Sequence, residues 1–431
     1  MKEEFLQYLW KNGLFDLNAM RTSDGLLIEI IKIGEYNTNS GPDFLNARIK
    51  IGRTIWVGNV EIHVRASDWF RHKHDKDSAY NNVILHVVDI FDNIVKTESN
   101  RELPTYIMQY DSNLYNYYRH IRKDSNLQRC ISRLDEDGYF ELKFWFNSLL
   151  LERLERKMED IFKLLKFNRN SWDDTFYQIF SRYLGMNVNS EPFELLAKST
   201  PLKYVYKQKH SLLQIESLLF GQAGFLNENL NDEYYKSLKT EYQYLKRKYS
   251  LESMQSTNWR FMRTRPINFP TLRIAELSSI LYSSSHLFSK ILEEEDLNRV
   301  YTFFKSDTSV YWDTHVKFGK KSEKKKKHLG DTAINILLIN VVVPILFSYG
   351  KYIKSQKYID RAYTFLENIK PEKNNITNIV SDCNIKLDNA IESQAIIQLK
   401  KEYCNKHRCL NCHIGNTILK KTNEETKHIN M

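Results

Sequence analysis

Glycine and proline are scarce in this 431-residue chain, which has 14 and 8 of them, and no apolar stretch is long. Because both residues interrupt regular secondary structure, their scarcity favours long helices. The longest apolar stretch, Ile334 to Phe347, contains Asn340 and Pro344, and its 14 residues fall short of the ~20 that span a bilayer. The chain opens with Met1-Lys-Glu-Glu4 and lacks the apolar segment of a signal peptide. We therefore expect a soluble, cytoplasmic protein.

Aromatic side chains and basic charge are plentiful. Hydrophobic residues make up 42% of the chain and aromatic residues 13%, which is ample for a core built on large rings. The length predicts two domains or one large composite. The net charge of +10 suits a polyanionic partner such as nucleic acid, either DNA or RNA, because basic side chains that contact phosphates release counterions. The alternative is an ordinary lysine-rich surface.

A strand with functional side chains is predicted over residues 54–64, Thr-Ile-Trp-Val-Gly-Asn-Val-Glu-Ile-His-Val. The alternation of side chains there has the period of two that is typical of a β-strand. Side chains two positions apart lie on the same face of a strand. Glu61 and His63 are therefore predicted to be neighbours.

A hairpin is predicted to bring a second carboxylate to this pair. Asp43 precedes the strand-forming residues 44–51, and Gly52-Arg53 is short enough to turn that strand back along 54–64. Two carboxylates so close would repel each other unless a cation lay between them, and hard oxygen ligands suit Mg²⁺. Asp43 and Glu61 are therefore candidate ligands of Mg²⁺ or Mn²⁺. The alternative is that Asp43 caps a turn and that Glu61 is solvated.

The surrounding segments predict an α+β fold. The order expected from the patterning is an amphipathic helix over 2–15, strands over 26–33, 44–51 and 54–64, a short helix with a loop over 67–82, a strand over 83–88, and a further strand or extended segment over 95–108. From Phe140 onward, helices are predicted over 174–185, 190–198, 209–221, 232–249, 271–293, 296–305, 331–348, 355–368 and 386–403. We predict an αβββαβ mixed-sheet domain in residues 1–112 and a mostly helical domain in residues 113–431.

This order of elements, together with Pro42-Asp43 and Glu61-Ile62-His63, resembles the PD-(D/E)XK nuclease superfamily. The resemblance covers about the first quarter of the chain. It implies a metal-dependent phosphodiesterase core in which Asp43 and Glu61 hold Mg²⁺ and the carbonyl of Ile62 adds a ligand. His63 stands where the superfamily usually has Lys. A Lys is a fixed positive charge, whereas a His can be neutral at pH 7 and serve as a base or a ligand.

Nearly the whole chain also resembles a family of bacterial proteins of unknown function. The phrases that carry this resemblance are Gly41-Pro-Asp-Phe44, Trp56-Val-Gly-Asn-Val-Glu-Ile-His63, Ser67-Asp-Trp69, Val83-Ile-Leu-His-Val87, Asn268-Phe-Pro270 and the terminal cysteines. The resemblance implies a bacterial origin and no particular activity.

Histidine is concentrated around the predicted site. His63, His72, His74 and His86 lie within 24 residues, although the chain holds only 12 histidines. Imidazole suits Zn²⁺, Mn²⁺ or Fe better than Mg²⁺, so His72 and His74 are candidate metal ligands. They are equally candidates for contacts to a substrate phosphate or for a solvated loop. His86 lies in an apolar strand and is interpreted as a hydrogen-bonded core residue. Glu35 is an additional candidate carboxylate.

An arginine-rich segment, residues 259–273, is a candidate substrate-binding surface. Arginine forms bidentate contacts with phosphate, and aromatic faces stack on bases. Arg263, Arg265 and Arg273 are therefore candidate contacts to a phosphate backbone. The alternative is a rigid connector, shaped by two prolines, whose arginines cap helices or pair with acids.

Cysteines form the second candidate metal site. Cys404, Cys409 and Cys412 lie close together with His407 and His413. In a cytoplasmic protein this spacing favours metal over disulfides. The three thiolates and one of the histidines would make a tetrahedral Zn²⁺ site. With a remote thiol, either Cys130 or Cys383, they would instead hold an iron–sulfur cluster, as some nucleases of the resembled superfamily do. A third alternative is three reduced thiols without metal.

The leading hypothesis is cleavage of a nucleic-acid phosphodiester by a metal-dependent nuclease. Asp43 and Glu61 would anchor the ion, which lowers the pKa of its bound water, and His63 would orient or deprotonate that water. Asp43, Glu61 and His63 are thus the candidate catalytic residues. One alternative is a non-catalytic scaffold that binds nucleic acid or protein and has lost the chemistry. Another is a histidine-rich metallohydrolase acting on small phosphoesters.

Overall fold

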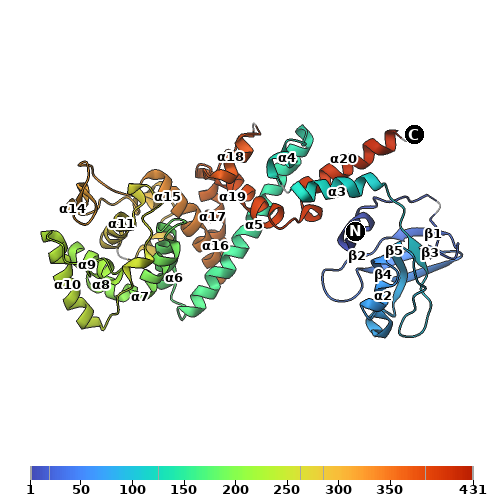
Figure 1. Cartoon of the computed structure of the whole chain (residues 1–431), viewed down its shortest axis with the longest axis horizontal. Helices are drawn as coiled ribbons and strands as arrows, with labels where there is room; N and C mark the ends of the chain where they lie inside the picture. The colour runs from blue at the N-terminus through green and yellow to red at the C-terminus, as the bar shows by residue number, and fades with distance from the viewer. Residues whose placement is uncertain are drawn as a thin grey trace. The chain divides into compact units, whose positions relative to one another are not determined.

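The computed structural model describes residues 2–429 except 19, 125, 263, 285 and 384, and it describes side chains through residue 421 apart from that of residue 124. Within these residues a six-stranded mixed sheet is followed by a large, mostly helical region, which confirms the predicted α+β fold (Figure 1). The chain forms two compact units. We call Met1–Leu142 with Lys400–Met431 the sheet unit, and Lys143–Leu399 the helical unit.

The sheet consists of β1 (Ile28–Lys32), β2 (Glu35–Tyr36), β3 (Phe44–Ile51), β4 (Thr54–Arg65), β5 (Val83–Ile90) and β6 (Thr105–Ile107). Its strand order is β1-β3-β4-β5-β6, and β2 pairs with the end of β3. The predicted hairpin is confirmed, since β3 and β4 are antiparallel and Ile51 pairs with Thr54. β5 runs parallel to β4, and β6 runs parallel to β5. The short helix α2 (Asp68–Arg71) lies in the crossover between β4 and β5.

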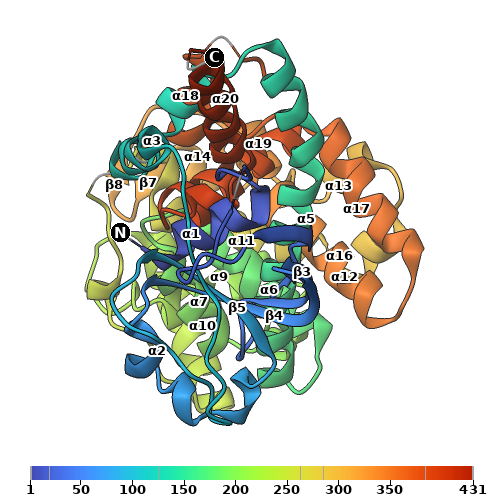
Figure 2. The ribbon, with the colours of Figure 1, turned by 90° about the vertical axis from the view of Figure 1, so that its right-hand side faces the viewer.

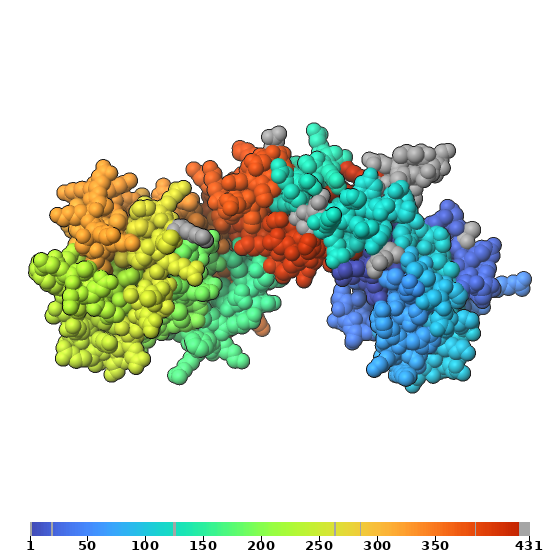
Figure 3. Space-filling model, viewed as in Figure 1, coloured from blue at the N-terminus to red at the C-terminus, as the bar shows by residue number. Residues whose placement is uncertain are grey.

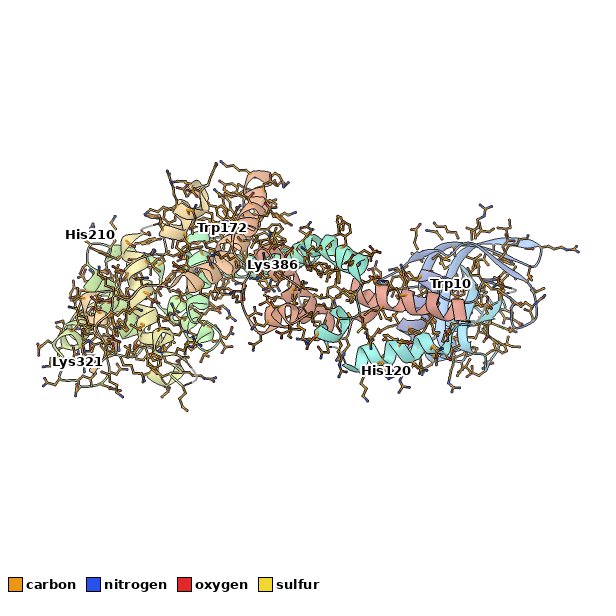
Figure 4. All side chains as sticks on the ribbon, turned by 90° about the horizontal axis from the view of Figure 1, so that it is seen from above. Trp10, His120, Trp172, His210, Lys321 and Lys386 are labelled. Atoms are coloured by element: carbon orange, nitrogen blue, oxygen red, sulfur yellow. The ribbon has the colours of Figure 1, made fainter. Side chains whose placement is uncertain are left out.

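Helix α1 (Glu3–Asn12) covers part of the sheet with an apolar stripe. Phe5, Leu6, Leu9 and Trp10 are fully buried. The Trp10 ring stacks on Phe15, and its indole N–H donates to a backbone carbonyl of the sheet unit (Figure 4). The helix ends at Gly13, whose φ of 63° is the left-handed conformation that glycine adopts readily. α1 is thereby held against β4, where the candidate site lies.

The sheet unit also contains two helices that follow the sheet in the sequence and one from the C-terminal segment. α3 (Ser112–Asp124) and α20 (His413–Ile429) pack side by side, and α4 (Leu127–Ile131) also contacts α20 (Figures 1 and 2). Tyr118 of α3 stacks on Phe5 of α1 with 5.1 Å between ring centroids. The helical unit is thus inserted in the sequence between two parts of the sheet unit. The predicted domain boundary between residues 112 and 113 stays a prediction, because compact units need not coincide with domains.

The helical unit is built on a core of buried aromatic and aliphatic residues. Its larger helices are α5 (Glu136–Phe167, beginning in the sheet unit), α6 (Trp172–Leu184), α7 (Ser190–Ser199), α9 (Leu212–Gln222), α10 (Glu233–Tyr249), α11 (Pro270–Ser283), α12 (Leu287–Glu293), α17 (Gln356–Asn368) and α19 (Ala390–Gln398). The helix predicted over 271–293 is two helices, α11 and α12, because Ser284 leaves the helical region with φ −128° and ψ 77°. A small hairpin, β7 (His315–Lys317) with β8 (Lys320–Lys321), was not predicted.

One described helix, Asp331–Tyr352, is long and apolar enough to cross a membrane, with 22 residues. It contains the apolar stretch that the sequence showed, and a π-helical turn, Leu338–Val342, precedes Pro344. In the most apolar 18-residue part of this helix, 83% is buried inside the protein, as expected for a core helix.

Gly58 of β4 lies where the neighbouring backbone leaves no room for a side chain. A Cβ atom there would lie 2.4 Å from the carbonyl oxygen of Asn82, and backbone cannot move away as a flexible side chain can. We expect Gly58→Ala to destabilise the protein by about 2 kcal/mol, measured by urea unfolding. Gly330→Ala is the matched control, since its Cβ would meet nothing within 4 Å. Equal losses in the two variants would contradict this account.

Candidate metal centre

Asp43 and Glu61 lie side by side, and each carboxylate is held by a backbone N–H of the other segment. The N–H of Asp43 donates to Oε2 of Glu61 at 3.0 Å, and the N–H of Ile62 donates to Oδ2 of Asp43 at 3.0 Å. This reciprocal pair forms because β3 and β4 are adjacent, with Phe44 opposite Val60. The hairpin therefore places both carboxylates at one end of the β3–β4 pair and fixes their orientation.

Helix α1 adds two polar residues that the sequence analysis did not identify. Nε2 of Gln7 donates to Oδ1 of Asp43 at 2.8 Å, and Gln7 also bonds to Tyr36 and Glu3. The available signal was a buried polar side chain within an apolar stripe, with Glu3 one helical turn before it. Gln7 thus fixes one oxygen of Asp43, and Glu3 adds a third carboxyl to the site.

Three histidines gather on the other side of Glu61. Ring nitrogens of His63, His72 and His74 all lie within 4.8 Å of one another. Nε2 of His63 lies 3.1 Å from Nδ1 of His72. Oε1 of Glu61 lies 3.6 Å from Nε2 of His63 and 3.4 Å from Nε2 of His74. Glu61 therefore gives one oxygen to the backbone of Asp43 and turns the other toward the histidine triad.

Local backbone geometry brings His72 and His74 to the same place. His72 ends α2, and His74 begins a short 3-10 turn. Lys73 between them has φ 64°, a left-handed conformation that redirects the chain. The ring of His74 stacks on Tyr80 with 3.7 Å between centroids. His74 is buried while His72 is exposed, so the triad meets solvent at His72.

His86 is fully buried, and its Nε2 lies 2.8 Å from Nδ1 of His63. The interpretation of His86 as a hydrogen-bonded core residue is confirmed. His86 is a partner behind His63, and a partner of this kind typically fixes the orientation of a ligating imidazole. Burial, then the neighbouring His86, lowers the pKa of His63 to about 2. His63 is therefore neutral at neutral pH, and the neutral imidazole is the form that binds a metal.

The carboxyl groups show the opposite effect. Burial, then the charge of Glu61, raises the pKa of Asp43 to about 7, and burial raises the pKa of Glu61 to about 8. Burial and then Asp43 raise the pKa of Glu3 to about 7. Burial also lowers the pKa of His72 and His74. The site thus combines neutral imidazoles, the form that binds metal, with carboxyl groups whose ionisation a cation would favour.

The other predicted site residues are placed as follows. Glu35 is exposed, and its carboxylate pairs with Lys32 at 2.9 Å. It takes part in none of the contacts described above for Asp43, Glu61 and the histidines. Arg265 is exposed, and Arg263 lies outside the described residues. Arg273 is buried, pairing with Glu276 at 2.8 Å and with Asn268 at 2.6 Å. A buried, paired guanidinium is unsuited to a phosphate backbone, so Arg273 is better explained as the predicted alternative, a partner of acids.

Two surface pockets with basic linings lie in the sheet unit. One, of about 440 Å³, is lined by Gln7 and Tyr36 and by the basic residues Lys2, Lys11, Arg122, Lys406, His407 and Arg408, among others. The second, of about 530 Å³, shares Lys2, Arg122 and His407 with it and adds Arg119, His120 and Lys123. Figure 3 shows the teal surface of the chain around α3 beside the red surface of the C-terminal segment, and these two parts supply most of the basic residues. Gln7 connects this basic surface to Asp43.

The C-terminal cysteines lie in the sheet unit as well. Cys404, Cys409 and Cys412 line one small apolar cavity, and Cys130 of α4 lines it too. Burial, and secondly the nearby Cys130 thiol, raises the pKa of Cys404 to about 12. None of the five cysteines, all of them described, forms a disulfide.

Comparison with known proteins gives a family. Residues 3–375 match the family described as "Protein of unknown function (DUF2851)". The chain belongs to this family. A search of curated proteins and a search of solved structures find no match to it. The matched region includes the site residues from Glu3 to His86, whereas Cys404, Cys409 and Cys412 lie beyond it. It carries no activity, so function must be argued from the site.

The stability of the metal-free protein should depend on pH in a defined direction. Asp43 and Glu61 have folded pKa values above their unfolded values, so their contribution to stability falls as the pH rises through about 8. His63 and His86 have lowered pKa values, so their contribution is complete above about 6.5. Between pH 6.5 and 8 the carboxyl groups therefore dominate, and we expect a loss of about 2 kcal/mol.

Thermal unfolding of chelator-treated protein at several pH values measures this loss. Glu61→Gln should lose markedly less stability over that range, because the amide has no proton to release. Glu102→Gln, at an exposed position, is the control and should behave like the unmodified protein. A stability that is flat or rises from pH 6.5 to 8 would contradict the electrostatic description.

Proposed function

We propose that this protein is a transition-metal-dependent phosphodiester hydrolase that acts on nucleic acid. The single observation that carries the proposal is the convergence of the histidine triad with Glu61, beside Asp43 and next to a basic pocket. The histidines supply the metal-binding groups, and the pocket supplies the positive charge that a polyanion requires.

The donor atoms fit a transition metal better than Mg²⁺. Three imidazoles and one carboxylate oxygen are typical of Mn²⁺, Fe²⁺ or Zn²⁺ sites, whereas Mg²⁺ prefers oxygen ligands and water. In a tetrahedral site with metal–nitrogen bonds near 2.05 Å, neighbouring ligand atoms lie about 3.3 Å apart. The separations of 3.1, 3.4 and 3.6 Å among these donors are close to that value. We propose Zn²⁺ and Mn²⁺ as the first cations to test.

The other polar groups would orient the site. A divalent cation held here would lower the pKa of a bound water and neutralise charge on a phosphate. His86 fixes the ring of His63, and the N–H of Asp43 fixes Glu61. The carboxylate of Asp43 faces the same site, where it can hold a second cation or orient the attacking water. His72, being exposed, is where substrate reaches the centre.

Nucleic acid is the substrate class that the surroundings favour. The two basic pockets share residues, so they form one surface whose lining includes Tyr36 and Tyr115. Lysine and arginine bind backbone phosphates, and tyrosine faces stack on unpaired bases. This combination suits a single strand of DNA or RNA better than a small phosphoester.

Cleavage assays on the purified full-length protein test the proposal. We expect cleavage of fluorescent single-stranded oligonucleotides with Zn²⁺ or Mn²⁺ and little with Mg²⁺. Asp43→Ala, Glu61→Gln and His72→Ala should each lower kcat/KM by about 100-fold or more, because each removes a ligand or an orienting group. His210→Ala, an exposed histidine of the helical unit, is the matched control and should retain full activity (Figure 4).

Substrate choice separates the alternatives. Hydrolysis of bis(p-nitrophenyl) phosphate without cleavage of any oligonucleotide would replace the proposal with a hydrolase of small phosphoesters. Oligonucleotide binding without cleavage under any metal would favour the non-catalytic scaffold. Full activity of His72→Ala and Glu61→Gln would show that the described site is not the active one.

A further inference from the structure

Four cysteine thiols from two distant parts of the chain surround one small cavity. Cys404, Cys409 and Cys412 come from the C-terminal segment, and Cys130 comes from α4. The rest of the cavity is apolar, including Ile121, Leu127 and Ile414. Cys130 and Cys404 are 274 positions apart, so their meeting is a property of the fold and could not follow from local spacing.

The other candidates for a fourth ligand are engaged elsewhere. Nδ1 of His407 lies 3.0 Å from the carbonyl oxygen of Arg122, and His413 lies 3.2 Å from Glu141. Neither histidine lines the cavity. Cys383 belongs to the helical unit. Of the alternatives that the sequence left open, Cys130 alone is placed with the three clustered thiols.

The backbone that follows Cys412 folds tightly around the cavity. Ile414 and Gly415 line the same cavity as the thiol of Cys412. Gly415 sits so close to Cys409 that a Cβ atom would lie 2.2 Å from the Cys409 carbonyl oxygen. A residue with a side chain would not fit here, so the glycine allows the chain to fold tightly around the cavity.

We propose that Cys130, Cys404, Cys409 and Cys412 form a tetrathiolate metal centre. Four cysteines are the ligand set of structural zinc sites and of iron–sulfur clusters. The metal has a structural role, because it cross-links α4 to the C-terminal segment. It thereby joins the two parts of the sheet unit that the helical unit separates in the sequence. This centre is distinct from the histidine site and does not depend on the proposed hydrolase activity.

The centre also has a consequence for the basic pocket. Lys406, His407 and Arg408 lie between Cys404 and Cys409 in the sequence, and all three line the pocket of about 440 Å³. Two metal bonds, one on each side of these residues, would fix the loop that presents them. Loss of the metal should therefore loosen that wall of the pocket and leave the histidine triad in place.

Metal analysis of the full-length protein, purified without oxygen, tests the proposal. We expect about one zinc per chain that a mercurial thiol reagent releases, or about four irons with matching sulfide and absorbance near 400 nm. The mercurial makes the measurement specific, since metal bound by imidazole is not displaced by thiol modification. Cys130→Ser should lower this thiol-dependent metal at least ten-fold, and Cys383→Ser, the matched control, should retain it.

A second measurement protects the test against a variant that fails to fold. In the unmodified protein, removal of the metal should make residues 400–431 at least five-fold more susceptible to limited proteolysis. The proposal is overturned if the unmodified protein carries no thiol-dependent metal. It is also overturned if Cys130→Ser holds as much of it as Cys383→Ser does. Neither result would bear on the hydrolase, whose failure is measured separately by cleavage.

Discussion

The reciprocal hydrogen bonds between Asp43 and the strand that carries Glu61 are the constraint on which the candidate site depends. Each carboxylate accepts a backbone N–H from the other segment, so neither can turn away without leaving a buried donor unpaired. The remaining oxygen of Glu61 then has one direction left, toward His63 and His74. The orientation of the metal-binding groups is therefore set by β-sheet pairing, which is among the most rigid features of a fold.

Part of this arrangement follows from the sequence. Period-two alternation placed Glu61 beside His63, and a two-residue turn placed Asp43 next to Glu61, because both relations are local. The structure shows both. The convergence of His72 and His74 on His63 depends on the left-handed conformation of Lys73. The sequence pattern of this loop does not predict that conformation. For that reason the sequence left the roles of these two histidines open.

Contacts between distant segments were beyond sequence reasoning. Gln7 and Glu3 reach Asp43 because α1 packs against β4, and the pairing of a helix with a strand 50 positions later has no local signature. Cys130 was one of two equal alternatives until the fold placed it. The partner of Arg273 was likewise left open, between a phosphate backbone and an acid, because its burial with Glu276 reflects tertiary packing that the run of arginines does not reveal.

The two candidate centres divide the sheet unit between them. The histidine site is built wholly from residues before β6, whereas the thiol site and much of the basic surface require α3, α4 and the C-terminal segment. The first would supply chemistry and the second would supply shape and charge. Membership in the family of unknown function is consistent with either role and selects neither.

The insertion of the helical unit between the two parts of the sheet unit affects the order of events during synthesis. A chain emerges from the ribosome N-terminus first, and its early segments can fold before the later ones exist. The carboxylates and histidines are therefore translated, and free to assemble, long before the ribosome reaches Lys406 and Arg408. During that interval the nascent chain would carry the residues of the candidate metal site without Lys406 and Arg408, so the proposed surface for a polyanion would be completed only after the whole helical unit has been made.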